Sequence, residues 1–241
     1  MELPRSLAAQ LYLLAWDARR ERIIGPWQIG TSLRAAALAD LVLSGQLTVE
    51  DRRVYAVAHP GLTGPGVSTS TSSGPGTPGS APLGRGARGA TRHLDPLLTD
   101  LVAATAAERP RRVGQWIQRG RRQIVVGVRE QLIDGRLIDV ERRRVAGIPF
   151  DLRIRVNDPL LIERLHTDVA RALAGGHVEL PEAILVALGA TAQLRTVLTW
   201  RQRRAHRGRL AELTAQATTG LPALPVILKA LRDAHAAAAA G

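Results

Sequence analysis

The sequence predicts a mainly α-helical protein: one globular helical domain with short antiparallel β-hairpins and a disordered loop insertion. Two observations predict this class. Apolar residues recur at helical spacing along most of the 241-residue chain. A pattern of helix, glycine, strand, acidic turn and strand also occurs twice. With 45% hydrophobic and 22% charged residues, the composition is that of a globular protein that buries its own core.

The first 57 residues predict two helices and a hairpin. A helix begins after Ser6, a good N-cap residue, and the Gly25-Pro26 pair interrupts the helical pattern. A second helix is expected from near Thr31 to Gly45, where the glycine ends it. Alternating apolar residues over 47–57 then predict a short hairpin.

Residues 59–92 are rich in Gly, Pro, Ser and Thr and offer almost nothing to bury, so they predict a disordered insertion within one domain spanning 1–241. Asp95 and Pro96 are an N-cap and a first helical residue, which predicts that order resumes there. Further helices are expected at 95–107, 113–134, 158–174, 181–190, 194–217 and 222–236.

The repeated pattern lies at 38–50 and again at 131–141. Each copy has a helix, a glycine, a strand that starts with leucine and an acidic turn, which is the outline of a winged-helix unit. Two copies predict two such units packed together. The segment Ile148–Val156 predicts a further extended or hairpin strand.

The charge is concentrated in two places. The chain has 33 basic and 21 acidic residues and a net charge of +12, and Lys229 is the only lysine. The stretch from Arg109 to Arg155 holds 13 arginines and 5 acidic residues, and Arg201 to Arg209 adds five arginines with no acid. Such concentration predicts a polyanionic partner, either a nucleic acid or an anionic membrane.

The sequence offers no sign of catalysis. Cysteine is absent, the six histidines stand apart, and no phosphate-binding loop or nucleophile elbow occurs. We therefore expect a binding protein rather than an enzyme, with no metal and no cofactor. No signal peptide or apolar span of about 20 residues is visible, which predicts a cytoplasmic protein whose membrane contact is peripheral.

Trp27 is the most informative aromatic residue. It follows Gly25-Pro26 and is expected in a turn before the second helix, where an exposed indole could enter a lipid headgroup layer or stack on a ligand. An indole folded back over the core is the alternative. Trp16, Trp116 and Trp200 lie within helical patterns and are expected to be core or partly buried.

Five segments in this order resemble the Golgi phosphoprotein 3 family, which includes bacterial, mostly actinobacterial, chains of about this length. They are Leu11-Tyr12-Leu13-Leu14-Ala15-Trp16-Asp17, the helix and strand from Leu33-Arg34 to Gly45-Gln46-Leu47, His93-Leu94-Asp95-Pro96-Leu97-Leu98, the stretch Arg129 to Leu137, and the strands that follow. The resemblance runs from Leu7 to Leu231 and is interrupted by the insertion.

The resemblance implies a mostly helical fold that docks on membranes by binding phosphatidylinositol 4-phosphate. In the family, a tryptophan, an arginine of the second helix and two arginines three apart on a later helix form the pocket. These positions fall here on Trp27, Arg34 and Arg122, with either Val125 or, after a slip of one turn, Arg119 as the remaining member. On one helix, Arg119 and Arg122 would share a face.

The resemblance also matches the hairpin containing Ile148 and Phe150 to one that the family uses for self-association or membrane contact; a buried strand is the alternative. The implied partners are an anionic phosphoinositide lipid and, through residues 148–156, a second copy of the chain. The membrane inner leaflet is the implied location, and protein clients are unknown. The competing hypothesis is a winged-helix nucleic-acid-binding protein that presents Thr31, Ser32 and Arg34 to DNA.

Overall fold

The computed structural model describes residues 3–57, 95–145 and 148–240, and this part is mainly α-helical, as predicted. The predicted insertion at 59–92 lies outside the described residues. The helices are α1 (Leu7–Leu14), α2 (Pro26–Leu43), α3 (Pro96–Ala107), α4 (Val113–Gln118), α5 (Arg121–Asp134), α6 (Pro159–Leu173), α7 (Leu180–Thr191), α8 (Trp200–Ala205), α9 (Arg207–Gly220) and α10 (Leu224–Ala240). The strands are β1 (Trp16–Asp17), β2 (Arg22–Ile23), β3 (Leu47–Glu50), β4 (Arg53–Ala56), β5 (Arg111–Arg112), β6 (Ile138–Val145) and β7 (Ile148–Val156).

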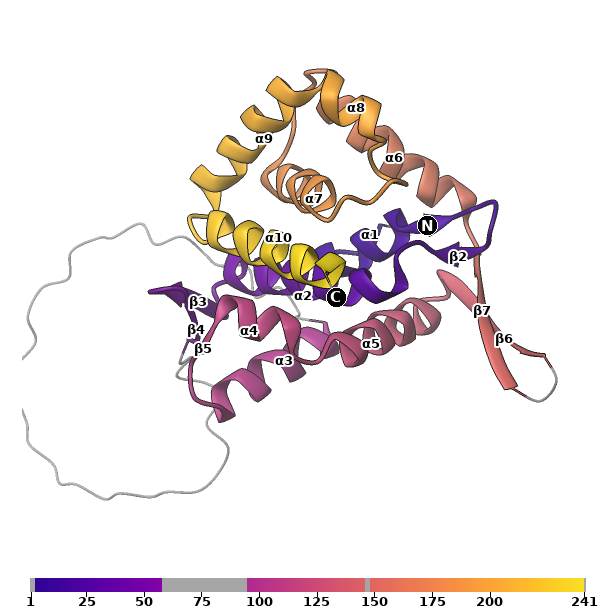
Figure 1. The fold of residues 1–241 in the computed structure, drawn as a ribbon, viewed down its shortest axis with the longest axis horizontal. Helices are drawn as coiled ribbons and strands as arrows, with labels where there is room; N and C mark the ends of the chain where they lie inside the picture. Colours follow the sequence, from indigo (N-terminus) through magenta and orange to yellow (C-terminus); the bar gives the residue numbers. More distant parts are fainter. Residues whose placement is uncertain (1–2, 58–94, 146–147, 241) are drawn as a thin grey trace, which may run out of the picture. The chain divides into compact units, whose positions relative to one another are not determined.

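Helix α2 is the centre of the packing. It contacts α1, α7 and α10 on one side and α3, α4 and α5 on another, and Figure 1 shows it running between these groups. Its residues from Leu33 to Ala39 are all buried. Because α2 is apolar nearly all round, as a helix in the middle of a core must be, its few polar side chains are enclosed by other elements.

The predicted start of this second helix near Thr31 is wrong, because α2 begins at Pro26. Gly25 adopts a left-handed conformation with φ 65°, and Pro26 occupies the first helical position, where its missing N–H costs nothing. The glycine–proline pair therefore opens the helix. Trp27 consequently lies in the first turn of α2 rather than in a turn before it.

The single helix predicted at 113–134 is divided in two. α4 ends at Gln118, Arg119 is extended with ψ 142°, and Gly120 is left-handed with φ 67° before α5 begins. A glycine adopts the left-handed conformation at little energetic cost, so Gly120 is the residue that allows the helix to break here. The helix predicted at 194–217 is likewise two shorter helices, α8 and α9.

The repeated pattern corresponds to two helix–hairpin units, but the acidic turn predicted in the second copy is wrong, because Asp139 and Glu141 lie within strand β6. α2 leads into the antiparallel pair β3–β4, and α5 leads into the antiparallel pair β6–β7. An equivalent backbone hydrogen bond ends the helix in each unit: the Gln46 N–H donates to the Leu41 carbonyl and the Leu137 N–H to the Leu132 carbonyl, both at 2.8 Å. The residue with left-handed backbone after the helix is Gly45 in the first unit and Arg136 in the second. The glycine of the second unit, Gly135, comes one position earlier and is not left-handed.

Two tryptophans differ from expectation. Trp16 belongs to strand β1 rather than to a helix, and its indole N–H donates to the carbonyl of Ile154 at 2.8 Å. Trp200 is 66% exposed on the short helix α8, so its predicted burial is wrong. Within the described ranges, none of the helices combines the length and apolar character needed to cross a membrane.

Asp40 of α2 links the core to the start of α1. Its Oδ2 accepts the Leu7 N–H at 2.7 Å, beside Ser6, whose hydroxyl accepts the Ala9 N–H. Burial raises the pKa of this carboxyl to about 7, although the hydrogen bonds from Leu7, Ala8 and Ser6 act to lower it. The protonated carboxyl is therefore favoured in the folded protein over a wider pH range than in the unfolded chain.

This raised pKa predicts a pH dependence of stability. Between about pH 4, the unfolded pKa, and pH 7, the folded protein binds the proton more tightly, so Asp40 makes stability fall as pH rises, by at most about 1.4 kcal/mol per pH unit. Asp40→Asn should remove this slope from urea unfolding curves measured between pH 4 and 8, relative to wild type. An unchanged slope in the variant would show that Asp40 titrates normally.

Candidate anion-binding pocket

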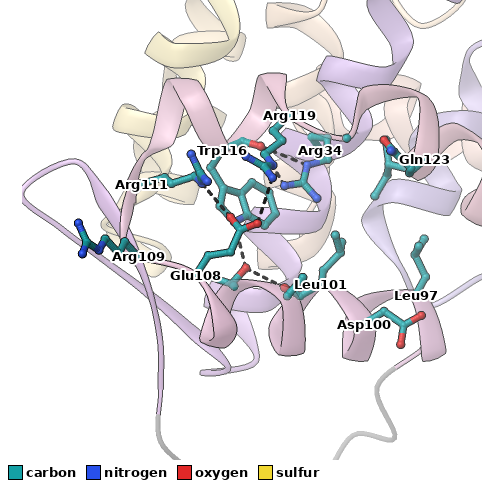
Figure 2. A pocket seen from close by; sticks show the side chains of 14 residues that line it. Arg34, Leu97, Asp100, Leu101, Glu108, Arg109, Arg111, Trp116, Arg119 and Gln123 are labelled. Carbon is teal, nitrogen blue, oxygen red and sulfur yellow. Dashed lines mark hydrogen bonds and ion pairs between the residues drawn. The ribbon is translucent and has the colours of Figure 1, made fainter.

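A cavity of about 330 Å³ opens between α2, α3, α4 and the start of α5. Its apolar wall comes mainly from α3 and from Trp116, and arginines from three segments of the chain line it; Figure 2 shows Arg34, Arg111 and Arg119 close together. The charged and polar residues that line it are Arg34, Asp100, Thr105, Glu108, Arg109, Arg111, Arg119 and Gln123.

Arg34 forms the buried part of the pocket. Its side chain comes from the middle of α2 and is only 7% exposed. The guanidinium carbon lies 3.6 Å from the centre of the Trp116 ring, and Nε and Nη2 donate to the Trp116 carbonyl at 3.3 and 2.9 Å. Stacking on an indole and pairing with a carbonyl both fix the plane of the guanidinium.

The surroundings of Arg34 lower the pKa of its guanidinium but leave the group charged at neutral pH. Burial lowers the pKa to about 10, nearby Glu108 acts to raise it, and Arg119 acts to lower it further. At neutral pH the group still carries its full positive charge. A buried cation beside other arginines is a strong attractor for an anion, because little water screens it.

A chain of hydrogen bonds holds Trp116 in place beneath Arg34. The indole N–H donates to the Thr105 hydroxyl at 3.1 Å, and that hydroxyl donates to the Leu101 carbonyl at 2.7 Å. Trp116 itself is 5% exposed. The arginine is therefore supported by a rigid aromatic platform, and its position is set before any ligand arrives.

Arg111 and Arg119 bring two more cations to the rim. Arg111 lies in β5, the third strand of the β3–β4 sheet, and pairs there with Val54. Arg119 is 60% exposed and occupies the extended residue between α4 and α5. Both guanidiniums pair with Glu108, at 2.8 Å from Arg111 and 3.2 Å from Arg119, and these arginines hold the pKa of Glu108 below its usual range.

Two of the residues predicted for a lipid site lie in this pocket. Arg34 and Arg119 line it together, whereas Arg122 is exposed on α5 and is not among the lining residues. The expectation that Arg119 and Arg122 share a helix face is wrong, because the left-handed Gly120 separates Arg119 from α5. Val125, the other candidate, is partly buried against the core.

The backbone places Trp27 on the same face of α2 as Arg34. The two residues are seven apart, or two turns, and Gly30 lies between them on that face. Gly30 packs against the start of α5, where an added Cβ would lie 2.4 Å from the Arg121 carbonyl oxygen. The side chain of Trp27 lies outside the described residues.

Sequence reasoning missed Trp116, Arg111 and Glu108. Trp116 was expected only to be core or partly buried, yet its ring supports Arg34 and lines the cavity. The cluster Arg109 to Arg112, immediately before the helix that carries Trp116, is the signal that could have pointed to these residues. Their proximity to Arg34, about 80 residues earlier, depends on tertiary packing.

Ile148 and Phe150 lie in strand β7, which pairs antiparallel with β6. Their side chains lie outside the described residues, so their part in self-association or membrane contact stays a prediction. At its base the hairpin is tied to the body: the Ile154 N–H donates to the Glu21 carbonyl at 2.7 Å, and Arg153 pairs with the Glu21 carboxylate.

The second basic segment surrounds the exposed Trp200 on α8 and the start of α9. Arg204 stacks over the Trp200 ring at 5.8 Å, and Arg201 and Arg207 are exposed. Arg209 has a structural role, since its guanidinium donates to the carbonyls of Ala172 and Gly176. Across the described ranges, no group of three or more His, Asp or Glu side chains is arranged to hold a metal ion.

A model of the family described as Golgi phosphoprotein 3 (GPP34) matches residues 7–234, nearly the whole chain. No curated protein matches the sequence.

Proposed function

The chain belongs to the Golgi phosphoprotein 3 family, and we propose that it is a peripheral membrane protein that binds the phosphorylated headgroup of an anionic phosphoinositide. We place the headgroup in the pocket between α2, α3 and α4. The observation that supports this most strongly is the buried Arg34 guanidinium, stacked on Trp116, with Arg111 and Arg119 at the rim.

The chemistry of these residues suits a phosphate ester. Arginine presents paired N–H groups in a fixed plane that match two phosphate oxygens, and such charge-assisted bonds are about twice as strong as neutral ones. Arg34 at the floor and Arg111 and Arg119 at the rim approach the cavity from α2, β5 and the α4–α5 junction. A phosphorylated ring that enters the cavity would meet donors from three directions.

Trp27 and Arg122 would add membrane contact around this site. Trp27 lies two turns before Arg34 along α2, and an indole is favoured at the depth of lipid headgroups. Arg122 is exposed in the first turn of α5 and would add about 1 kcal/mol of attraction to an anionic leaflet before screening. Self-association through residues 148–156 would join two such sites on one surface and strengthen attachment.

The rival nucleic-acid function has less support. The side chains that a recognition helix would present, Thr31, Ser32 and Arg34, are 3%, 0% and 7% exposed. A helix that reads a DNA groove needs those positions accessible.

Co-sedimentation with vesicles tests the proposal. Neutral vesicles would be compared with vesicles that carry phosphatidylglycerol, phosphatidylinositol or phosphatidylinositol 4-phosphate at matched total charge. We expect preferential binding to phosphatidylinositol 4-phosphate, and we expect Arg119→Gln to lower it about tenfold, the loss of one charge-assisted contact. Arg195→Gln, which removes an exposed arginine outside the pocket, is the matched control.

Binding that depends on vesicle charge alone, with equal losses for Arg119→Gln and Arg195→Gln, would contradict the proposal. A salt-sensitive shift of duplex DNA by the wild-type protein, absent in Arg119→Gln, would point to a nucleic acid instead.

A further inference from the structure

The surface of α8 and the start of α9 carries a second concentration of positive charge, apart from the pocket. Arg201, Arg203, Arg204 and Arg207 lie there, and among the described residues none of these four guanidiniums is part of an ion pair. A solvated helix face ordinarily mixes both signs of charge. A run of arginines without acidic partners therefore favours binding of an external anion.

Trp200 stands among these arginines. It is 66% exposed, and the Arg204 guanidinium carbon lies 5.8 Å from the centre of its ring. The other large apolar side chains that are exposed in the described ranges lie elsewhere in the chain, at Val57, Val126, Ile133 and Leu160. The α8 surface thus presents one aromatic ring surrounded by cations.

Hydrogen bonds hold this surface in place. Thr199 and Gln202 close a capping box on α8, in which each side chain accepts the backbone N–H of the other residue, at 3.3 and 2.9 Å. Arg209 ties the start of α9 to the end of α6 by donating to the carbonyls of Ala172 and Gly176, at 2.9 and 3.0 Å. The ring and the arginines are therefore carried on anchored backbone before a ligand arrives.

A bilayer is a poor match for this surface. A helix that lies in a membrane interface buries an apolar face, but the residues of α8 after Trp200 are three arginines, a glutamine and an alanine. Figure 1 also shows α8 on the other side of α2 from α3, which lines the pocket. A membrane held at the pocket would not reach α8.

A nucleic acid matches the surface better than a protein partner does. Protein–protein interfaces have an apolar core, which one indole among arginines does not provide. Nucleic-acid interfaces are more polar and much more positively charged. Single strands also expose the faces of their bases, and an aromatic side chain beside cations is the usual means of binding them.

We propose that the α8–α9 surface binds single-stranded nucleic acid, an activity separate from the proposed lipid binding. The Trp200 indole stacks on one unpaired base, and Arg201, Arg204 and Arg207 contact neighbouring phosphates. Stacking on a base does not depend on its identity, so the surface binds without a strict sequence preference. A duplex offers less, because its bases are already stacked on one another.

Fluorescence anisotropy with labelled oligouridylate and oligothymidylate, each twelve nucleotides long, tests the inference. We expect both to bind, with log K falling by about 2 for each tenfold rise in salt, the slope for three phosphate contacts on a single strand. Trp200→Ala should lower the affinity about tenfold, the effect of losing one stacked base, whereas Trp200→Phe should keep most of it. Tighter binding of one oligonucleotide would identify RNA or DNA as the better ligand and would equally support the inference.

The arginine variants separate this surface from the pocket. Arg204→Gln should weaken binding and reduce the salt slope by about 0.7, because one phosphate contact is lost. Arg232→Gln, which removes an exposed arginine of α10, is the matched control and should bind both oligonucleotides like wild type. Arg119→Gln, which alters the pocket, should also bind them like wild type.

Two other anions, phosphatidylglycerol vesicles and a twelve-residue polyglutamate, provide the contrary outcomes. Vesicle binding that Trp200→Ala abolishes, without binding of either oligonucleotide, would make the surface a membrane contact and overturn the inference. Polyglutamate that binds as tightly as the oligonucleotides, or equal oligonucleotide affinities for Trp200→Ala and wild type, would show attraction by charge alone and would overturn it too. Each of these failures would leave lipid binding at the pocket unaffected.

Discussion

Arg34→Lys is expected to weaken binding to phosphatidylinositol 4-phosphate vesicles by about ten- to hundredfold while the protein stays folded. Lysine keeps the positive charge but cannot stack flat on Trp116 or present paired N–H groups. Loss of a hydrogen bond to a charged group costs about 1.5–3 kcal/mol, which corresponds to this fold-change. Vesicle co-sedimentation gives the affinity, and circular dichroism checks the fold.

The control for this substitution is Arg232→Lys on α10, where the arginine is exposed and outside the pocket lining. It should bind like wild type. Equal affinity for Arg34→Lys and wild type would mean that the buried guanidinium takes no part in binding. The proposal that the headgroup binds in this pocket would then lose its strongest argument.

Gly30→Ala is expected to destabilise the fold by about 1–3 kcal/mol, the usual cost of overpacking, and to impair binding as well. The added Cβ would lie 2.4 Å from the Arg121 carbonyl oxygen and 3.1 Å from the Arg121 Cβ, so α2 and α5 must move apart. That movement would displace the α4–α5 junction that carries Arg119 relative to Arg34. Urea unfolding measures the loss of stability.

Gly114→Ala provides the comparison, because this glycine lies in α4 with nothing within 4 Å of an added Cβ. Alanine in a helix is favoured over glycine by about 0.5–1 kcal/mol, so this variant should be slightly more stable than wild type. If both alanine variants unfold at the same urea concentration, the close approach of α2 to α5 is absent in solution.

Periodicity and caps identified most of the fold. Asp95 and Pro96 identified the start of α3, and the first copy of the repeated pattern identified the β3–β4 hairpin, whereas the acidic turn expected in the second copy lies inside β6. Two of the errors in helix boundaries occurred at glycines. Gly25 before a proline opens α2, and Gly120 inside an apolar pattern breaks a helix, since a left-handed residue serves equally well at a helix start or between helices.

Only part of the candidate site could be predicted from the sequence. Arg34 and Arg119 were named from the resemblance, and the structure brings both to one cavity. Trp116 and Glu108 were not predicted as site residues. An indole at helical spacing gives the same sequence pattern whether it fills a core or supports a guanidinium. Their roles depend on the contact of α4 and α3 with α2, which is a tertiary property.

The most direct test of the central claim is NMR detection of the arginine Nε–H groups during titration with inositol 1,4-bisphosphate. The account predicts that the signals of Arg34, Arg111 and Arg119 shift together and saturate at one ligand equivalent, while those of Arg201, Arg204 and Arg207 barely move. Shifts confined to the α8–α9 arginines, or spread evenly over all arginines, would contradict it.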